Sequence, residues 1–202
     1  MLDNLTIIDF ETTGLPEHGP QRAIEVAAVK VLKGEIVSQF QTIIRQDIPV
    51  SEKITELTGI TQQDVDKGMS EKTAFAVVNN MSAGTTLVAH NMLFDWQFYD
   101  DALQRLGGRR LTADLLCSMT LTRQFLGGKG HKLTQLMDRL GLAHSGAHRA
   151  LADVHMTLQL LRVLDAQYDI YQYVNQLSYV AYFGKPRAYP LNCRLIPYQP
   201  VK

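Results

Sequence analysis

The chain has 202 residues, of which 46% are hydrophobic and 20% charged, and its 20 basic residues balance 20 acidic ones. This length suits one large domain or one domain with an extension, and zero net charge argues against a protein that coats duplex nucleic acid through a broad positive surface. Two cysteines without a CxxC motif argue against a disulfide framework and favour a reduced, cytoplasmic setting. The N-terminus has no basic signal-peptide region, and no apolar run reaches the ~18 residues of a membrane span, so no membrane association is expected.

The predicted elements alternate between strands and helices. Apolar runs at 5–10 and 85–90 predict buried strands, and residues 23–45 predict a hairpin around Lys33-Gly34. Capping residues, glycine stops and helical periodicity predict further helices, which lie at 51–59, from 61, from 70, at 92–108, within 111–128 after a short strand, at 132–142 and at 147–167. This order predicts an α/β fold with a mixed sheet.

The C-terminal end differs from the rest. Residues 184–202 contain four prolines, four basic residues and no acid, which predicts a tail or an extended strap outside the core. We therefore expect one domain over 1–167, followed over 168–202 by a helical segment and a Pro-rich basic tail.

Two acids end the first predicted strand. Asp9 and Glu11 are separated by one residue, so their side chains share one face of the strand. The carboxyl ends of strands in open α/β sheets are the usual place for ligands. The simpler alternative is a solvated strand end.

A third acid, Asp95, follows the strand at 85–90 and lies in the first turn of the next predicted helix. An acid there interacts favourably with the helix dipole, which is also its simplest explanation. Asn91 is the expected N-cap of this helix.

His148 and Asp153 precede or begin the longest predicted helix. A spacing of five residues places them roughly 140° apart around a helix, so we expect His148 on the loop or first turn and Asp153 one turn deeper. The alternatives are a surface histidine and an i,i+4 salt bridge between Arg149 and Asp153.

Taken together, these segments resemble a known family. D-F-E-T-T-G at 9–14, H-N-x-x-F-D at 90–95 and H-x-x-x-x-D at 148–153 resemble, in order, the three motifs of the DnaQ-like DEDDh 3′–5′ exonucleases. Arg149 stands where the sister DEDDy group has tyrosine, which favours the histidine subtype. The resemblance covers residues 5–165 and implies an RNase H-like three-layer α/β/α fold with a mixed, roughly five-stranded sheet, and so an exonuclease domain over 1–167.

The resemblance also implies a metal site. It assigns two divalent ions, Mg²⁺ or Mn²⁺, to Asp9, Glu11, Asp95 and Asp153. Clustered carboxylates repel one another, and ligand sets made of oxygen alone suit these ions. One ion would activate a water and the other would stabilise the leaving 3′-oxygen. His148 is the implied general base, because an imidazole exchanges protons close to neutral pH.

Seven substrate-binding residues are implied in the same way, namely Thr12, Thr13, Gly14, Leu15, His90, Asn91 and Phe94. Backbone N–H groups in the turn after the first strand can bind a terminal 3′-OH or phosphate. Leu15 would wedge against the terminal base, with packing of the turn as its alternative. Phe94 could stack on a base, with burial as its alternative, and His90 and Asn91 could orient Asp95 or touch phosphate.

Four weaker features complete the sequence predictions. His131 lies in the Gly-rich basic loop GGKGHK and is expected to be solvated. Asp114 has a family counterpart and is a candidate buttress of the site. The arginines of 105–110 form a basic edge that could follow a nucleic-acid strand. Residues 176–183 are weakly similar to peptides that bind sliding clamps, on a segment expected to be helical.

The function expected from this resemblance is a metal-dependent 3′–5′ exonuclease that releases nucleotides from single-stranded DNA ends, in proofreading or repair. Its partners would be a single-stranded 3′ end, DNA before RNA, and a polymerase or other replication or repair protein acting in trans. One alternative is an exoribonuclease or oligoribonuclease of the same fold. A non-catalytic nucleic-acid-binding domain is disfavoured, because all five residues of the implied catalytic set are present.

Overall fold

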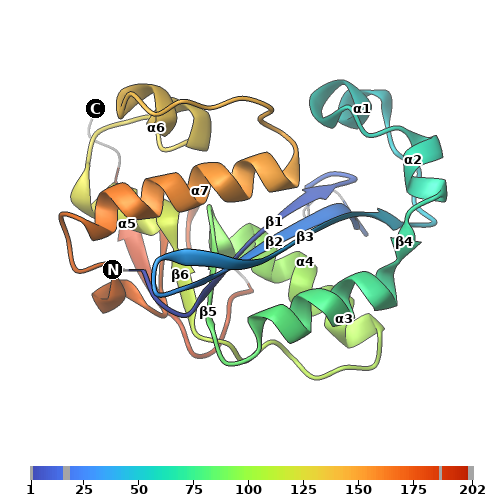
Figure 1. The fold of residues 1–202 in the computed structure, drawn as a ribbon, viewed down its shortest axis with the longest axis horizontal. Coiled ribbons are helices and arrows are strands. Elements are labelled where there is room, and N and C mark those ends of the chain that lie inside the picture. Colours follow the sequence, from blue (N-terminus) through green and yellow to red (C-terminus); the bar gives the residue numbers. More distant parts are fainter. Residues whose placement is uncertain (1, 16–18, 187, 200–202) are drawn as a thin grey trace.

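A six-stranded mixed sheet forms the centre of the protein (Figure 1). The computed structural model describes residues 2–15, 19–186 and 188–199. The strands are β1 (Leu5–Thr12), β2 (Ala23–Leu32), β3 (Glu35–Arg45), β4 (Met69–Ser70), β5 (Thr86–Ala89) and β6 (Leu115–Cys117). Their spatial order is β4-β3-β2-β1-β5-β6. The helices are α1 (Glu52–Thr58), α2 (Gln62–Asp66), α3 (Glu71–Ser82), α4 (Met92–Arg105), α5 (Ser118–Phe125), α6 (Leu133–Arg139) and α7 (Ala150–Asp165).

The sheet begins as an antiparallel meander and continues with parallel strands. β1 pairs with β2 and β2 with β3 in antiparallel fashion, whereas β1–β5 and β5–β6 are parallel. Lys33 and Gly34 have φ angles of 51° and 84°, the two left-handed residues that a tight hairpin turn requires. The mixed sheet predicted from the sequence is therefore confirmed.

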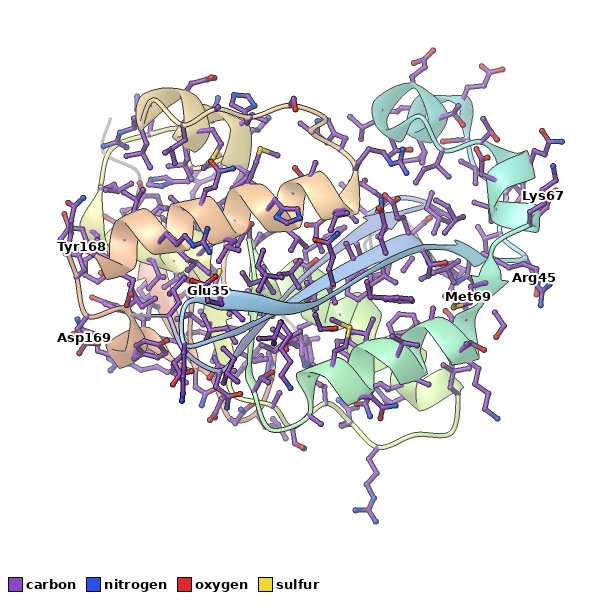
Figure 2. All side chains as sticks on the ribbon, viewed as in Figure 1. Glu35, Arg45, Lys67, Met69, Tyr168 and Asp169 are labelled. Atoms are coloured by element: carbon purple, nitrogen blue, oxygen red, sulfur yellow. The ribbon has the colours of Figure 1, made fainter. Side chains whose placement is uncertain are left out.

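The sheet has one strand more than the roughly five that were expected. The additional strand is β4, which pairs in parallel with Ile44 and Arg45 at the end of β3. Figure 2 shows the Arg45 and Met69 side chains where these two strands meet. A strand of two residues has no alternation that a sequence pattern could reveal.

Three of the predicted helix starts are confirmed in atomic detail. The side chains of Ser51, Thr61 and Ser70 each accept a hydrogen bond from the backbone N–H three residues later. The first helix ends at Gly59, whose φ of 74° is left-handed, the conformation that glycine adopts most readily at a helix end.

Helices cover both faces of the sheet, which fixes the direction of each β1 side chain. In Figure 1, α7 lies along one side of the strands and α3 along the other. Leu5 and Ile7 pack in the core beneath α7, whereas Ile8 and Phe10 pack in the core with α3 and α4. Because side chains alternate along a strand, Asp9 and Glu11 continue the face that α7 covers.

The segment after α7 differs from the predicted helix and tail. It contains two short 3-10 helices and a separate two-stranded parallel sheet, made of η2 (Ile170–Tyr173), β7 (Gln176–Val180), η3 (Ala181–Phe183) and β8 (Arg194–Tyr198). Leu177 is 0% exposed and Cys193 is 8% exposed, and both belong to the core beneath α3 and α4. Because Cys193 lies within residues 184–202, the expectation that this stretch stays outside the core is wrong.

Leu177 is buried, so this leucine is not accessible to a partner. The segment at 176–183 therefore does not present itself as a clamp-binding peptide. The Gln176–Leu177 pair belongs to a strand. Within residues 2–15, 19–186 and 188–199, no helix is both long and apolar enough to cross a bilayer.

Candidate active site

Three carboxylates meet at the carboxyl end of β1. Asp9, Glu11 and Asp153 can each offer an oxygen such that all three oxygens lie within 4.8 Å of one another. Asp9 and Glu11 come from the face of β1 that α7 covers, and Asp153 comes from the first turn of α7 itself. A register shift between Glu11 and Thr12 ends the regular pairing with β2 at this point, as bulges beside active sites commonly do.

The start of α7 has the geometry expected for its histidine and its acid. His148 precedes the helix in an exposed position with a φ of 65°, a conformation that residues other than glycine rarely adopt. Its backbone N–H donates to the Asp153 carboxylate at 3.2 Å. The alternative pairing of Arg149 with Asp153 is not formed, because the Arg149 guanidinium binds Glu25 instead.

Asp95 approaches this group from the other side of β1. It lies in the first turn of α4, is 2% exposed, and accepts a backbone hydrogen bond from Phe10. Among the described residues, the trio with mutually close oxygens does not include Asp95, although the Asp95 charge acts on Asp9. Asn91 is the N-cap of α4, as expected, but it has a left-handed φ of 71° and its side chain forms no capping bond.

The electrostatics of the four acids disfavour their joint ionisation. Burial, followed by the charge of Asp95, raises the pKa of Asp9 well above its ordinary value. Burial and the Asp153 charge raise the pKa of Glu11 to about 8. Burial is also the largest cause of the raised pKa values of Asp95 and Asp153. A divalent cation relieves this repulsion, and the cluster, made of carboxylate oxygens alone, fits Mg²⁺ or Mn²⁺.

A fifth buried carboxylate, Glu25, was missed in the sequence analysis. It lies on β2 directly across from Glu11 and is 0% exposed. The signal was present, because Glu25 interrupts the apolar run AIEVAAV, where an acid on a core-facing position requires partners.

The turn after β1 is held by its own side chains. The Thr12 hydroxyl donates to the Gly14 carbonyl at 2.9 Å, and the Thr13 hydroxyl donates to the Gln21 side chain at 2.6 Å. Gly14 lies against the Gln21 side chain. A Cβ at position 14 would lie 3.0 Å from the Gln21 side-chain oxygen. Leu15 projects outward and is 46% exposed.

His90 and Phe94, which follow β5, are both held by contacts inside the protein. His90 Nδ1 lies 2.8 Å from the Ser118 hydroxyl, and its Nε2 lies 2.8 Å from the His131 carbonyl. Burial lowers the pKa of His90 to about 4, so the ring is neutral near pH 7. Both ring nitrogens therefore serve internal hydrogen bonds. Phe94 is partly buried and lies 4.9 Å from the Phe98 ring, centroid to centroid.

His131 is a buried residue, contrary to the solvated loop that was expected. It is 8% exposed, and its ring nitrogens lie within hydrogen-bond distance of Thr122, Gly128 and Tyr198. A Gly-rich basic loop gave no sign of this burial, because Tyr198 lies 67 positions away in the chain.

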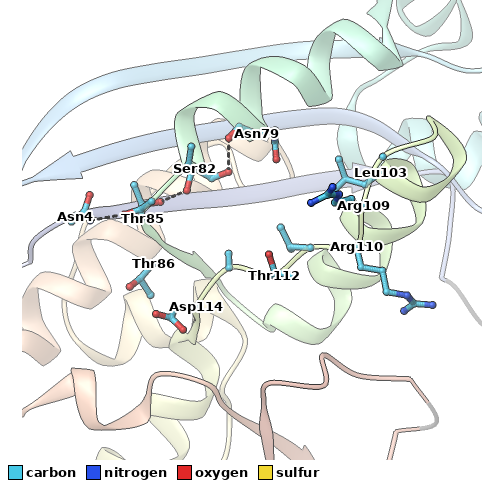
Figure 3. A pocket seen from close by; sticks show the side chains of 15 residues that line it. Asn4, Asn79, Ser82, Thr85, Thr86, Leu103, Arg109, Arg110, Thr112 and Asp114 are labelled. Atoms are coloured by element: carbon cyan, nitrogen blue, oxygen red, sulfur yellow. Dashed lines mark hydrogen bonds between the residues drawn. The ribbon is translucent and has the colours of Figure 1, made fainter.

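Asp114 lies at the opposite end of the sheet from the carboxylate cluster. It precedes β6 and lines a cavity of about 700 Å³ together with Asn4 and Thr86 (Figure 3). Leu5 pairs with Thr86 at the start of β1, four residues before Asp9. Asp114 therefore does not buttress the site.

The predicted arginine edge is largely engaged within the protein. Arg105 forms ion pairs with Glu71 and Asp101, and Arg110 pairs with Asp100. Arg109 is exposed and lines the cavity of Figure 3. The prediction of a continuous strand track along 105–110 has no support in this arrangement.

Comparison with known proteins identifies the family. Residues 6–161 match the model of the RNase_T family, which is described as exonuclease. The chain belongs to this exonuclease family. DNA polymerase III PolC-type from Thermotoga maritima is 30% identical over 154 residues, 76% of this chain and 11% of that protein. The 3′-5′ exonuclease DinG from Bacillus subtilis is 33% identical over 161 residues, 79% of this chain and 17% of that protein.

Solved structures place this exonuclease-family chain among RNase H-like α/β folds. Exonuclease X in complex with 5′ overhanging duplex DNA is 26% identical, with a TM-score of 0.67 over 83% of this chain and 96% of that one. The nuclease domain of 3′hExo, a DEDDh family member bound to rAMP, is 24% identical, with a TM-score of 0.70 over 81% of this chain and 92% of that one. The α/β fold and the membership of an exonuclease family are thus confirmed. The chain spans only 11% of the length of the PolC-type relative.

Proposed function

We propose that the protein is a metal-dependent 3′–5′ exonuclease that hydrolyses the terminal phosphodiester of single-stranded DNA. The observation that carries this proposal is the convergence of Asp9, Glu11 and Asp153 within 4.8 Å at the carboxyl end of β1. Repulsion among buried carboxylates disfavours this arrangement unless cations bind there. Together with Asp95, the trio supplies the ligands for two Mg²⁺ or Mn²⁺ ions.

The chain's own residues divide the chemical work. When bound, the two ions would supply an activated water and stabilise charge on the leaving oxygen. His148 is exposed at the edge of the cluster and is tied to Asp153 through its backbone N–H. Its imidazole is therefore free to take a proton from the attacking water.

The turn after β1 forms the seat for the 3′-terminal nucleotide. Thr12 and Thr13 are buried and hydrogen-bonded, so they give the turn a fixed shape. Leu15 is 46% exposed beside this turn and would pack against the terminal base. Phe94 and Asn91 lie at the start of α4 beside this seat, and His90 precedes them with its ring hydrogen-bonded to Ser118 and to the His131 carbonyl.

DNA is the proposed substrate because the named relatives point to it. The DinG relative is a 3′-5′ exonuclease, the PolC-type relative is a DNA polymerase, and Exonuclease X was solved with duplex DNA carrying a 5′ overhang. The PolC-type relative also supports a replication or repair role beside a polymerase. RNA is the second candidate, since the nuclease domain of 3′hExo was solved with rAMP.

A side-by-side digestion tests both candidates. Matched 5′-labelled single-stranded DNA, duplex DNA and RNA are incubated with the protein and Mg²⁺ or Mn²⁺, with EDTA as control. We expect stepwise shortening of single-stranded DNA that EDTA abolishes. Preferential shortening of RNA would transfer the proposal to an exoribonuclease, and survival of all three labelled substrates would refute the enzyme.

A further inference from the structure

We propose that Glu25 and Arg149 form a positioning clamp that holds His148 over the carboxylate cluster. The inference rests on the proposed nuclease function and adds two residues to it. Neither residue belongs to the metal-binding trio. Glu25 lies outside the three sequence motifs, and Arg149 occupies a position of the third motif, 148–153, at which the motif specifies no residue type.

The Glu25 carboxylate joins the sheet to the first residues of α7. Its two oxygens accept from the Arg149 Nη2 at 2.8 Å, the Arg149 Nε at 3.3 Å, the Ala150 backbone N–H at 3.0 Å and the Gln41 side chain at 2.8 Å. Four donors thus occupy a side chain that is 0% exposed. Glu25 is therefore engaged in structural bonds and is not available as a metal ligand.

The clamp acts next to the proposed base. Arg149 follows His148 directly, and the Arg149 carbonyl accepts the Asp153 backbone N–H at 3.1 Å. The His148 backbone N–H in turn reaches the Asp153 carboxylate. The residues of 143–146 that lead to His148 are exposed, so the bonds at Glu25 mark the point where this loop becomes fixed to the sheet.

Stability alone explains this arrangement poorly. The ion pair is only half buried, because the Glu25 side chain is 1% exposed and the Arg149 side chain is 46% exposed. Desolvation of Glu25 offsets part of the attraction, and an exposed partner contributes little to stability. Here the cost is higher, since the Glu25 charge also acts unfavourably on Asp9, Glu11 and Asp153. A planar fork fixes direction as well as distance, which suits a role in orienting the start of α7.

The geometry of the fork predicts which substitution will be informative. Arg149→Lys keeps the positive charge but cannot form two parallel bonds to Glu25. A displacement of the base by about 1 Å can cost on the order of 10²-fold in rate. We therefore expect Arg149→Lys to lower kcat by roughly tenfold, with an unchanged KM for the oligonucleotide and a wild-type circular dichroism spectrum.

The chain contains a matched control pair. Arg105 forms a similar fork with Glu71, at 2.7 and 2.9 Å, at the far end of α4 from Asp95. Arg105→Lys should leave kcat within about twofold of wild type, because a fork at this site does not touch the start of α7. Loss of kcat in the control variant as well would show that any loosened fork impairs the protein.

The deciding experiment combines Arg149→Lys with His148→Ala. If the clamp acts by orienting the imidazole, Arg149→Lys should lower kcat in the wild-type background and have almost no further effect in the His148→Ala background. Equal fold losses in both backgrounds would overturn the inference, as would an unchanged kcat in the single variant. Glu25→Gln should reproduce the loss seen with Arg149→Lys, provided that it folds. Absence of metal-dependent hydrolysis in wild type would instead refute the proposed function.

Discussion

Removing one charge from the carboxylate cluster is expected to stabilise the metal-free protein. Burial and the Asp153 charge raise the pKa of Glu11 from 4.5 to about 8. The folded protein thus holds a proton that the unfolded chain releases. Its stability without metal should therefore fall as the pH rises from about 4.5 to about 8. The neutral side chain of Glu11→Gln removes the Glu11 part of this dependence, whereas the raised pKa values of Asp9, Asp95 and Asp153 keep their own parts.

The size of the effect follows from the same shift. At roughly 1.36 kcal/mol per pKa unit, the Glu11 shift sets an upper limit of about 5 kcal/mol on the cost of ionising this group in the fold. Relaxation of neighbouring side chains reduces this figure, and we expect roughly 2–3 kcal/mol at pH 8. For a chain of this size, that corresponds to a rise in Tm of roughly 4–12 °C.

Thermal unfolding in EDTA at pH 5 and pH 8 measures this difference. Glu56→Gln provides the control, because Glu56 is an exposed acid on α1 outside the cluster. Wild type and the control should lose Tm between the two pH values, and Glu11→Gln should lose much less. Adding Mn²⁺ should restore the Tm of wild type at pH 8, and it should raise the Tm of Glu11→Gln by far less. Equal pH slopes for all three proteins would refute the reasoning about charge repulsion.

Three further predictions concern the base, the substrate seat and the C-terminal sheet. His148→Ala should lower turnover by roughly 10²-fold or more while retaining the Tm increase caused by Mn²⁺, and an unchanged rate would remove His148 from its role as base. Leu15→Ala should raise the KM for single-stranded DNA by roughly threefold to tenfold through lost apolar contact, and an unchanged KM would leave Leu15 as turn packing. Tyr198→Phe should lower the free energy of unfolding by about 1–2 kcal/mol, because the hydroxyl donates to Gly128 and meets His131, while Tyr182→Phe, at a side chain 91% exposed, should change nothing.

The C-terminal segment shows where sequence reasoning was misled. Proline and basic residues in 184–202 correctly excluded a regular helix there, yet Cys193 and β8 pack into the structure. The β7–β8 pairing joins Gln176 with Arg194 and Val180 with Tyr198. Short parallel strands need only a few matched backbone groups, and five residues with little alternation leave no clear periodic signal.

The carboxylate cluster shows the converse case. The position of Asp9 and Glu11 on one face follows from the two-residue period of a strand, and the placement of His148 before α7 and Asp153 within its first turn follows from helix geometry. These are local properties, so the amino-acid sequence determined them without reference to the rest of the fold. The resemblance to the exonuclease motifs then joined them into one site.

Other features depended on contacts between distant parts of the chain. Arg149 and Glu25 are 124 positions apart, and no local pattern could pair them. The burial of His131 and the placement of Asp114 at the far end of the sheet were decided by the order of the strands and by the return of β8 over the loop at 127–131. The sequence by itself thus determined which carboxylates share a face and begin a helix, because periodicity is local. Only the tertiary structure decided that Arg149, next to His148, pairs with the buried Glu25, because that contact exists only when distant strands and helices meet.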